Sequence, residues 1–388
     1  MLGAGVFFVW APAAAAAGSS LLISLLIAAV IAALNAFSSA QLAMAHPVSG
    51  GAYAFARATI GPWTGFAAGW LFLAGKTASC AAIALIAGSY LWPEYSRVIA
   101  VAAIIVFAGL NISGIRTTAV VTTAIVAVVI TGLGMITASG LVTEPATSPI
   151  EFNGGVAGIL QAAGLLFFAF AGYARMATLG EEVIDARRNL PRAILIALGI
   201  ALVIYGSIGV LLVSRLGTDA LATTDSPLAA LFGTDVAVTT VAIVAAVACF
   251  GSLIGILAGL SRTSLAMARH RDLPAYLDRI SVRTNTPVAA EITIAIIAVL
   301  AVVFLDPAVL VGFSSCAVLI YYAIAHASAF RQPAGERWLH RWVQVGGILG
   351  CLLLAFTLPL PGVLATLAWL LVGLALRKFR QNTKSALP

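Results

Sequence analysis

Long apolar runs constrain this sequence more than any other feature. A helix needs about 18 or more consecutive apolar residues to cross a hydrocarbon core roughly 30 Å thick. Of 388 residues, 62% are hydrophobic and 9% are charged, whereas soluble domains carry about 25% charged residues. We predict an all-α integral membrane protein with about twelve transmembrane helices. These cover residues 3–17, 21–45, 62–90, 97–113, 118–140, 155–178, 191–215, 237–260, 288–305, 308–330, 342–357 and 360–377.

The distribution of basic residues predicts the orientation of these spans. Cytoplasmic loops of membrane proteins carry an excess of Lys and Arg. If the first span begins inside, 17 of the 21 Lys and Arg lie in cytoplasmic loops and the C-terminal tail, whereas Arg97 and Arg215 lie outside. The net charge of +7 therefore indicates membrane topology, and we expect no nucleic-acid partner. We predict a multi-pass protein of the inner (cytoplasmic) membrane, embedded in the lipid bilayer, with both termini in the cytoplasm.

Two of the predicted spans contain sites at which a helix can unwind. Gly3, Ala4 and Gly5 open the first span, and residues 168–173 (FAFAGY) lie in the sixth. Paired glycine-interrupted segments in corresponding halves of a chain indicate the binding site of a transporter built from inverted repeats. A helix N-terminus suits a carboxylate, and a C-terminal end suits a cation. The alternative interpretation is that these small residues only permit close helix crossing.

Five short motifs follow one another in order along almost the whole chain. Residues 3–7 (GAGVF), 46–53 (HPVSGGAY), 65–70 (GFAAGW), 167–191 (FFAFAGYARMATLGEEVIDARRNLP) and 261–274 (SRTSLAMARHRDLP) together resemble the signature segments of the amino acid-polyamine-organocation permeases, of the bacterial amino acid permease type. Each motif alone is weak, but in register they are specific. The chain begins almost on the first motif, where family members usually carry a tail and half a helix, so we expect a shortened first helix.

The resemblance implies a leucine-transporter-type fold. Five helices (1–140) would repeat, inverted, in the next five (141–335), with two helices and a cytoplasmic tail appended (336–388), and helices 1 and 6 would be broken. The substrate carboxylate would meet backbone N–H groups near Gly3, Ala4 and Gly5. The substrate amine would face carbonyl groups near the sixth-helix break, and one of two aromatic rings would close over it as a gate. These residues are Phe168, Ala169 and Ala171 for the carbonyls, and Phe170 and Tyr173 for the gate.

Charged residues near the middle of the membrane form a second group of candidates. Proton-coupled relatives carry a lysine in helix 5, which residues 118–140 lack, but Lys76 lies in the third span. An ionised side chain there costs roughly 2.5–3.5 kcal/mol on insertion scales, so we expect it to face the interior with a partner. We predict that it is a tether between helices or a group that titrates during transport; a purely structural pairing is the alternative. Arg175 either faces the cavity or, as we predict, pairs at a cytoplasmic gate with Glu181 and Glu182.

The sequence therefore predicts a transporter rather than an enzyme. Catalytic sites need clustered acids, histidines or nucleophiles, and Glu181 and Glu182 have no such neighbours. The four cysteines lie within apolar spans without metal-type spacing, so we predict neither a metal nor a cofactor. We predict a secondary active transporter of amino acids that works by alternating access, driven by protons or by exchange. The alternatives are a transporter of polyamines or other organic amines and, less favoured, a membrane-embedded enzyme.

Overall fold

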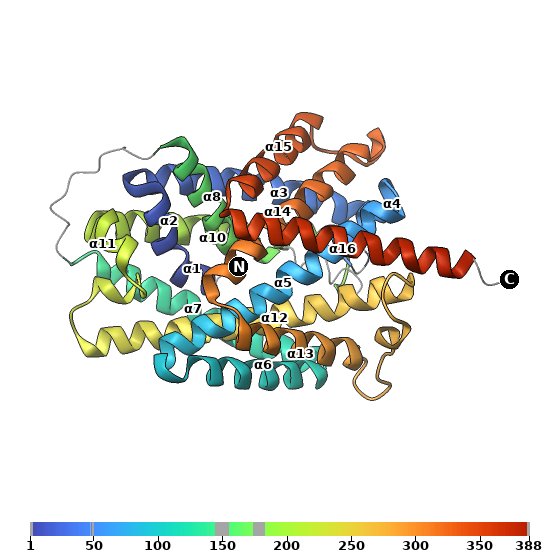
Figure 1. Ribbon diagram of the computed structural model, residues 1–388. Coiled ribbons are helices and arrows are strands. Elements are labelled where there is room, and N and C mark those ends of the chain that lie inside the picture. Colours follow the sequence, from blue (N-terminus) through green and yellow to red (C-terminus); the bar gives the residue numbers. More distant parts are fainter. Residues whose placement is uncertain (1–2, 47, 49, 144–154, 174–182, 386–388) are drawn as a thin grey trace.

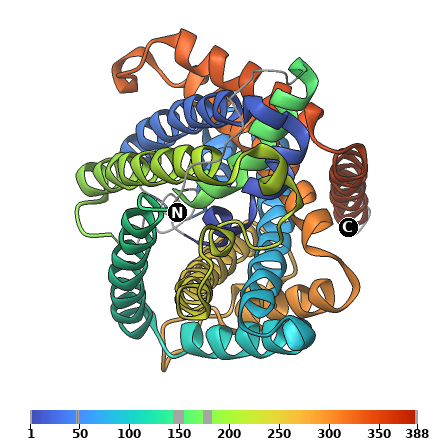
Figure 2. The same cartoon turned by 90° about the vertical axis from the view of Figure 1, so that its left-hand side faces the viewer.

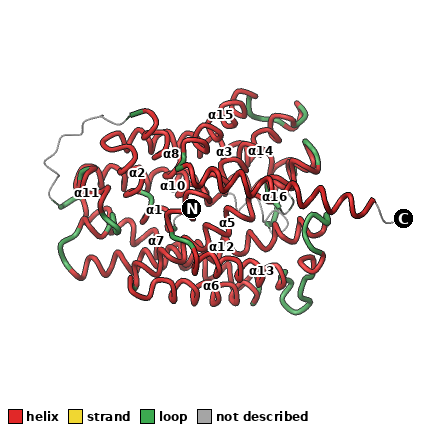
Figure 3. Tube along the Cα trace, in the orientation of Figure 1, coloured by secondary structure: helices red, strands yellow, loops and turns green. Residues whose placement is uncertain are grey.

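The computed structural model describes residues 3–46, 48, 50–143, 155–173 and 183–385, and its regular elements over these residues are helices (Figure 3). The first part of the chain forms α1 (Ala4–Phe8), α2 (Trp10–Ala17), α3 (Leu21–Ala45), α4 (Ala52–Thr59), α5 (Pro62–Leu91), α6 (Ser96–Ile112) and α7 (Ile115–Gly140). The second part forms α8 (Val156–Phe170), α10 (Ala186–Leu216), α11 (Thr218–Thr223), α12 (Asp235–Arg269), α13 (Val288–Phe304), α14 (Pro307–Arg331), α15 (Arg341–Thr357) and α16 (Leu360–Ser385).

Each predicted apolar run is helical over almost all of its described residues; the exceptions are Val9 and single residues at the ends of runs. Within the described residues, eight helical segments are long and apolar enough to cross a membrane, and three shorter apolar helices accompany them. The segment Trp10–Ala45 counts once, because a 3₁₀ turn (Gly18–Ser20) joins α2 to α3. The all-helical architecture is thus confirmed over the described residues. The division into twelve spans and the inverted repeat at 1–140 and 141–335 stay predictions.

Glycine and proline residues set the corners between helices. Gly18 has a φ of 54° and Gly61 a φ of 144°, backbone conformations that side chains with a Cβ rarely adopt. Pro62 and Pro307 occupy the first turns of α5 and α14, where a missing N–H costs no helical hydrogen bond. These residues end one helix and begin the next within a few positions.

Helix α5 forms the centre of the molecule. It packs against α12 and α14, and 89% of its most apolar window is buried, against 22% for α7. Small residues permit the close contact: a Cβ added to Gly75 would lie 2.9 Å from Ala317 Cβ, and the Ser79 and Ser314 hydroxyls are 2.6 Å apart. Figures 1 and 2 show α1 in the interior, with α6 and α15 on opposite sides of the bundle. The N-terminal helix therefore begins inside the protein.

Candidate functional site

Helix α1 presents its N-terminal end to the interior. Gly3 is extended (φ −155°, ψ −153°) and α1 begins at Ala4. The Val6 N–H donates to Gly3 O (3.2 Å) and the Val9 N–H to Gly5 O (3.1 Å). The N–H groups of residues 3–5 thus precede the first internal helical bonds, as at any helix N-terminus. The glycines lie at the start of the helix, and a slight interruption follows at Val9, where the Trp10 indole donates to Val6 O (2.7 Å).

Helix α8 presents the opposite polarity. It ends at Phe170 and continues as one 3₁₀ turn (Ala171–Tyr173). The Tyr205 hydroxyl donates to Ala169 O (3.1 Å), and Lys76 Nζ donates to Ala171 O (2.9 Å). Carbonyl groups at a helix C-terminus carry partial negative charge. The carbonyl end of α8 therefore holds a cation.

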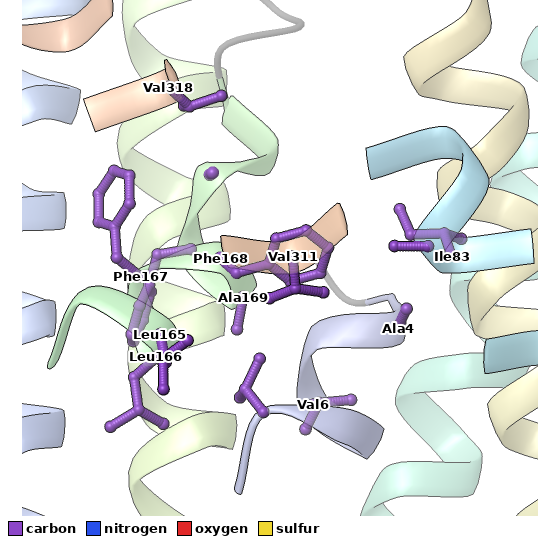
Figure 4. Packing of buried hydrophobic residues seen from close by; sticks show 14 of the residues in the cluster. Ala4, Val6, Ile83, Leu165, Leu166, Phe167, Phe168, Ala169, Val311 and Val318 are labelled. Atoms are coloured by element: carbon purple, nitrogen blue, oxygen red, sulfur yellow. The ribbon is translucent and has the colours of Figure 1, made fainter. Parts of the chain in front are cut away.

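The two helix ends border the same cavity, which has a volume of about 390 Å³. Its lining includes Gly3, Ala4 and Gly5 of α1, Phe168 and Ala169 of α8, and Lys76 of α5. Figure 4 shows Ala4, Ile83, Phe168 and Ala169 converging from three helices. Helices α7, α10 and α12 complete the walls with Thr122, Ile125, Val126, Val129, Ile130, Ala197, Ile200, Gly251, Ser252, Gly255 and Ile256.

The other sequence-predicted residues lie elsewhere or outside the described residues. Phe170 is buried and packs edge-on against the Tyr205 ring, with the centroids 4.9 Å apart, and it does not line the cavity. Ala171 reaches the site through its carbonyl group, which Lys76 binds. Tyr173 is described only as part of the 3₁₀ turn. Arg175, Glu181 and Glu182 lie outside the described residues, and their role as a gate stays a prediction.

Close packing between helices is a second explanation for Gly3 and Gly5, beside a role in the binding site. A Cβ added to Gly5 would lie 2.4 Å from Ala169 Cα, and one added to Gly3 would lie 1.9 Å from Ser252 Oγ. Neither distance is compatible with a side chain unless the helices separate. The glycines thus bring the start of α1 against α8 and α12, which also places its N–H groups at the cavity.

Lys76 is the charged side chain among the described residues that line the cavity. It is 6% exposed, and its ammonium donates a hydrogen bond to the Ala171 carbonyl at the end of α8. Burying a charge is tolerable only when it is hydrogen-bonded or paired. This geometry is what the tether interpretation requires, and titration of Lys76 stays a prediction.

Two tyrosines that bind carbonyl groups of α1 and α8 were not identified from the sequence. Tyr205 binds the Ala169 carbonyl, and the Tyr90 hydroxyl donates to Phe7 O (2.9 Å). A buried Tyr usually finds a partner for its hydroxyl, so a tyrosine inside an apolar span signals a polar contact. The sequence gives no indication of which carbonyl it meets.

A second polar cluster joins three distant segments near the ends of α12 and α16; we call it the Asp272 cluster. Asp272 accepts from the Tyr53 hydroxyl (2.9 Å), and lies 3.1 Å from both Arg57 and Arg377. Arg377 also stacks over the Phe66 ring at 4.8 Å. Burial, with the Asp272 carboxylate nearby, raises the pKa of Tyr53. Segments 46–53, 65–70 and 261–274, which carry the family resemblance, thus meet at this cluster.

Comparison with known proteins identifies the family. A family model described as amino acid permease matches residues 1–374. The chain belongs to the amino acid permease family. This permease is 47% identical over 382 residues to uncharacterized transporters of Mycobacterium tuberculosis and Mycobacterium bovis, covering 97% of this chain and 87% of each relative. It is 26% identical to cationic amino acid transporter 7, chloroplastic, of Arabidopsis thaliana, covering 95% of this chain and 68% of the relative.

Membership confirms the resemblance to the amino acid-polyamine-organocation superfamily. The family and the names of the relatives indicate a transporter rather than an enzyme. Together with the long apolar helices, they make this permease a multi-pass membrane protein with a small-molecule substrate.

Proposed function

We propose that this permease is a secondary active transporter that moves amino acids across the cytoplasmic membrane by alternating access around the cavity between α1 and α8. One observation carries the proposal: an N-terminal helix end and a C-terminal helix end face the same cavity. The first suits the carboxylate of a zwitterion and the second its ammonium. The volume of about 390 Å³ falls within the range of about 300–1,000 Å³ for small-molecule sites.

Polyamines and other organic amines are the second candidate class. A diamine carries two positive charges, and a buried charge needs a counter-charge or coordinating groups. The described residues of the cavity wall include no carboxylate, which favours amino acids over diamines. The Arabidopsis relatives are named as cationic amino acid transporters, so cationic amino acids remain one candidate within the proposed class.

Lys76 is the proposed site of proton coupling. In this conformation its ammonium holds the carbonyl end of α8, which is also the proposed subsite for the substrate amine. A cation at that position must move or lose its proton before a second cation binds, which links substrate binding to proton release. We expect Lys76→Met to abolish acceleration of uptake by a proton gradient. Acceleration that survives unchanged in this variant would exclude Lys76 as the coupling group.

The proposed orientation places both termini in the cytoplasm. It rests on the 17 Lys and Arg of the predicted cytoplasmic segments and on the positive-inside rule. Reporter fusions at the C-terminus test it: a fluorescent protein that matures only in the cytoplasm should be fluorescent there. A periplasmic alkaline phosphatase reporter that is active at the same position would contradict the orientation.

Uptake into liposomes tests the function itself. Purified permease is reconstituted and supplied with labelled L-amino acids or with putrescine and spermidine. A ligand that binds the folded state should also raise its unfolding temperature. Gly5→Leu is a poor test variant, because Gly5 packs on the α8 backbone.

Ala197→Leu is more suitable, because Ala197 lines the cavity and is half-buried. Ala193→Leu, one turn earlier on α10 and away from the cavity lining, is the matched control. We expect Ala197→Leu to lose amino acid uptake and Ala193→Leu to retain it. Transport of polyamines alone would replace the proposed substrate class.

A further inference from the structure

The walls of the cavity are aliphatic away from the two helix ends. Ile83 of α5, Ile125, Val129 and Ile130 of α7, Ile200 of α10 and Ile256 of α12 all line it. A substrate whose carboxylate lies at α1 and whose amine lies at α8 must direct its side chain toward one of these walls. Contact of an apolar group with such walls is favourable, whereas a polar group finds no hydrogen-bond partner on them.

The polar groups of the lining are few and bear no negative charge. Besides Lys76, the described lining side chains with polar atoms are Ser79, Thr122 and Ser252. The Ser79 hydroxyl already contacts Gly75 O (3.2 Å) and the Ser314 hydroxyl (2.6 Å). Lys76 adds a positive charge at the carbonyl end of α8. Within the described residues, nothing at the cavity wall provides a counter-charge for a second ammonium group.

We infer that the cavity selects amino acids with uncharged aliphatic side chains and discriminates against those with cationic side chains. This inference rests on the proposed function and adds the substrate class. A side-chain ammonium placed against the aliphatic walls loses its hydration without gaining a partner. A methyl group at the same position loses nothing on leaving water and gains contact. The preference follows from the wall, whichever protonation state Lys76 adopts.

Norleucine and lysine form the most direct pair of probes, because lysine carries an ammonium where norleucine ends in a methyl group. We expect norleucine to compete for uptake of a labelled neutral amino acid roughly tenfold or more better than lysine, because an unpaired buried charge is strongly disfavoured. The same order should appear in the thermal stabilisation of the purified protein by the two ligands.

Adding a carboxylate to the wall tests the cause of the preference. Thr122 lines the cavity from α7, and its neighbour Thr123 is exposed and does not line it. Thr122→Asp should therefore reduce the disadvantage of lysine, whereas Thr123→Asp, the matched control, should leave it at the wild-type level. Stabilisation of both variants by norleucine verifies that they are folded and retain the site.

The outcomes separate the inference from the proposed function. If lysine competes as well as norleucine or better, the inference is overturned, but transport of amino acids stands. Equal lysine discrimination in Thr122→Asp and Thr123→Asp would refute the counter-charge argument. If no amino acid binds or is transported, the proposed function fails, and the inference with it.

Discussion

Asp272→Asn should destabilise the permease more than a single surface substitution does. The Asp272 and Arg377 side chains are 6% and 7% exposed, and their nearest charged atoms are 3.1 Å apart. The substitution removes the negative charge but keeps the shape of the side chain. The Arg377 guanidinium would then be buried without its counter-charge. Its hydrogen bond to Pro62 O (2.8 Å) and its stacking over Phe66 would remain.

The expected loss of unfolding free energy depends on which of the two ion pairs of Asp272 is buried. Breaking a buried ion pair by removing one partner costs about 3–5 kcal/mol. The Arg57 side chain is 25% exposed, so its pair with Asp272 is worth less. Because Arg377 keeps its other contacts, we expect a loss near the lower end, about 3 kcal/mol of unfolding free energy. Asp278→Asn is the matched control: it breaks a pair with Arg269 at 3.7 Å, with both side chains over 40% exposed, and should cost less than about 1 kcal/mol.

A thiol-reactive fluorophore provides the assay. All four cysteines are buried, so the dye reports unfolding of the protein in detergent as temperature rises. Asp272→Asn should lower the unfolding midpoint clearly more than Asp278→Asn. Replacing both partners, as in Asp272→Leu with Arg377→Met, should recover much of the loss, because no charge is then left buried. Equal midpoints for the two single variants would refute the argument that Asp272 organises a buried cluster.

Three further predictions follow from individual contacts. Gly5→Ala should cost about 1–3 kcal/mol of unfolding free energy, because the new Cβ would lie 2.4 Å from Ala169 Cα, whereas Gly134→Ala, with no atom within 4 Å, should be neutral or stabilising in the same thermal assay. Tyr205→Phe should cost about 1–3 kcal/mol by removing the donor to a buried carbonyl, and an unchanged midpoint would contradict this contact. Folding raises the pKa of Tyr53 above its ordinary value of 10.0, so the folded state gains stability that is fully present below pH 10 and is lost as the pH rises further. The unfolding free energy should therefore fall less steeply above pH 10 in Tyr53→Phe than in wild type.

The helices themselves could be predicted because a bilayer leaves the backbone few choices. Every N–H and C=O group in the hydrocarbon region must be satisfied within its own segment, so apolar runs such as 62–90 and 308–330 become helices. Their ends follow from local chemistry, as at Gly61 and Pro62. The link between α2 and α3 is a short 3₁₀ turn (Gly18–Ser20), and it lies at the boundary predicted between residues 3–17 and 21–45.

The candidate site was predictable in part. Residues 3–5 and 168–169 line one cavity. They could be identified from the sequence because helix ends and small residues are local signals. Phe168 and Phe170, however, are two positions apart, and an α-helix turns about 100° per residue. They therefore point to opposite sides, and Phe170 packs against Tyr205 instead. Helical geometry applied to the sequence would have shown that only one of these two rings can face the cavity.

Contacts between distant helices could not be derived from the sequence. Lys76 and Ala171 are 95 residues apart, and Ala52 and Tyr321, whose backbone N–H and hydroxyl form a bond of 3.1 Å, are 269 apart. The expectation that Lys76 faces the interior with a partner follows from the cost of burying a charge. That this partner is a backbone carbonyl at a helix end depends on how α5 and α8 pack, which no local pattern encodes.

The charge balance of the cavity yields a last prediction. The proposed zwitterionic substrate would bring a carboxylate to the positive end of α1, but its ammonium would meet a carbonyl end that already holds Lys76 Nζ at 2.9 Å. Two unit charges about 4 Å apart repel by about 4 kcal/mol at an effective dielectric constant near 20, so the complex is favoured when Lys76 releases its proton. Mixing substrate with the permease in weakly buffered solution should therefore release protons in wild type and not in Lys76→Met, as followed with a pH-sensitive dye. Lys378→Met, the same change at an exposed position on α16, should release protons as wild type does. Substrate binding by the wild-type protein without any proton release would show that Lys76 keeps its charge and moves aside instead.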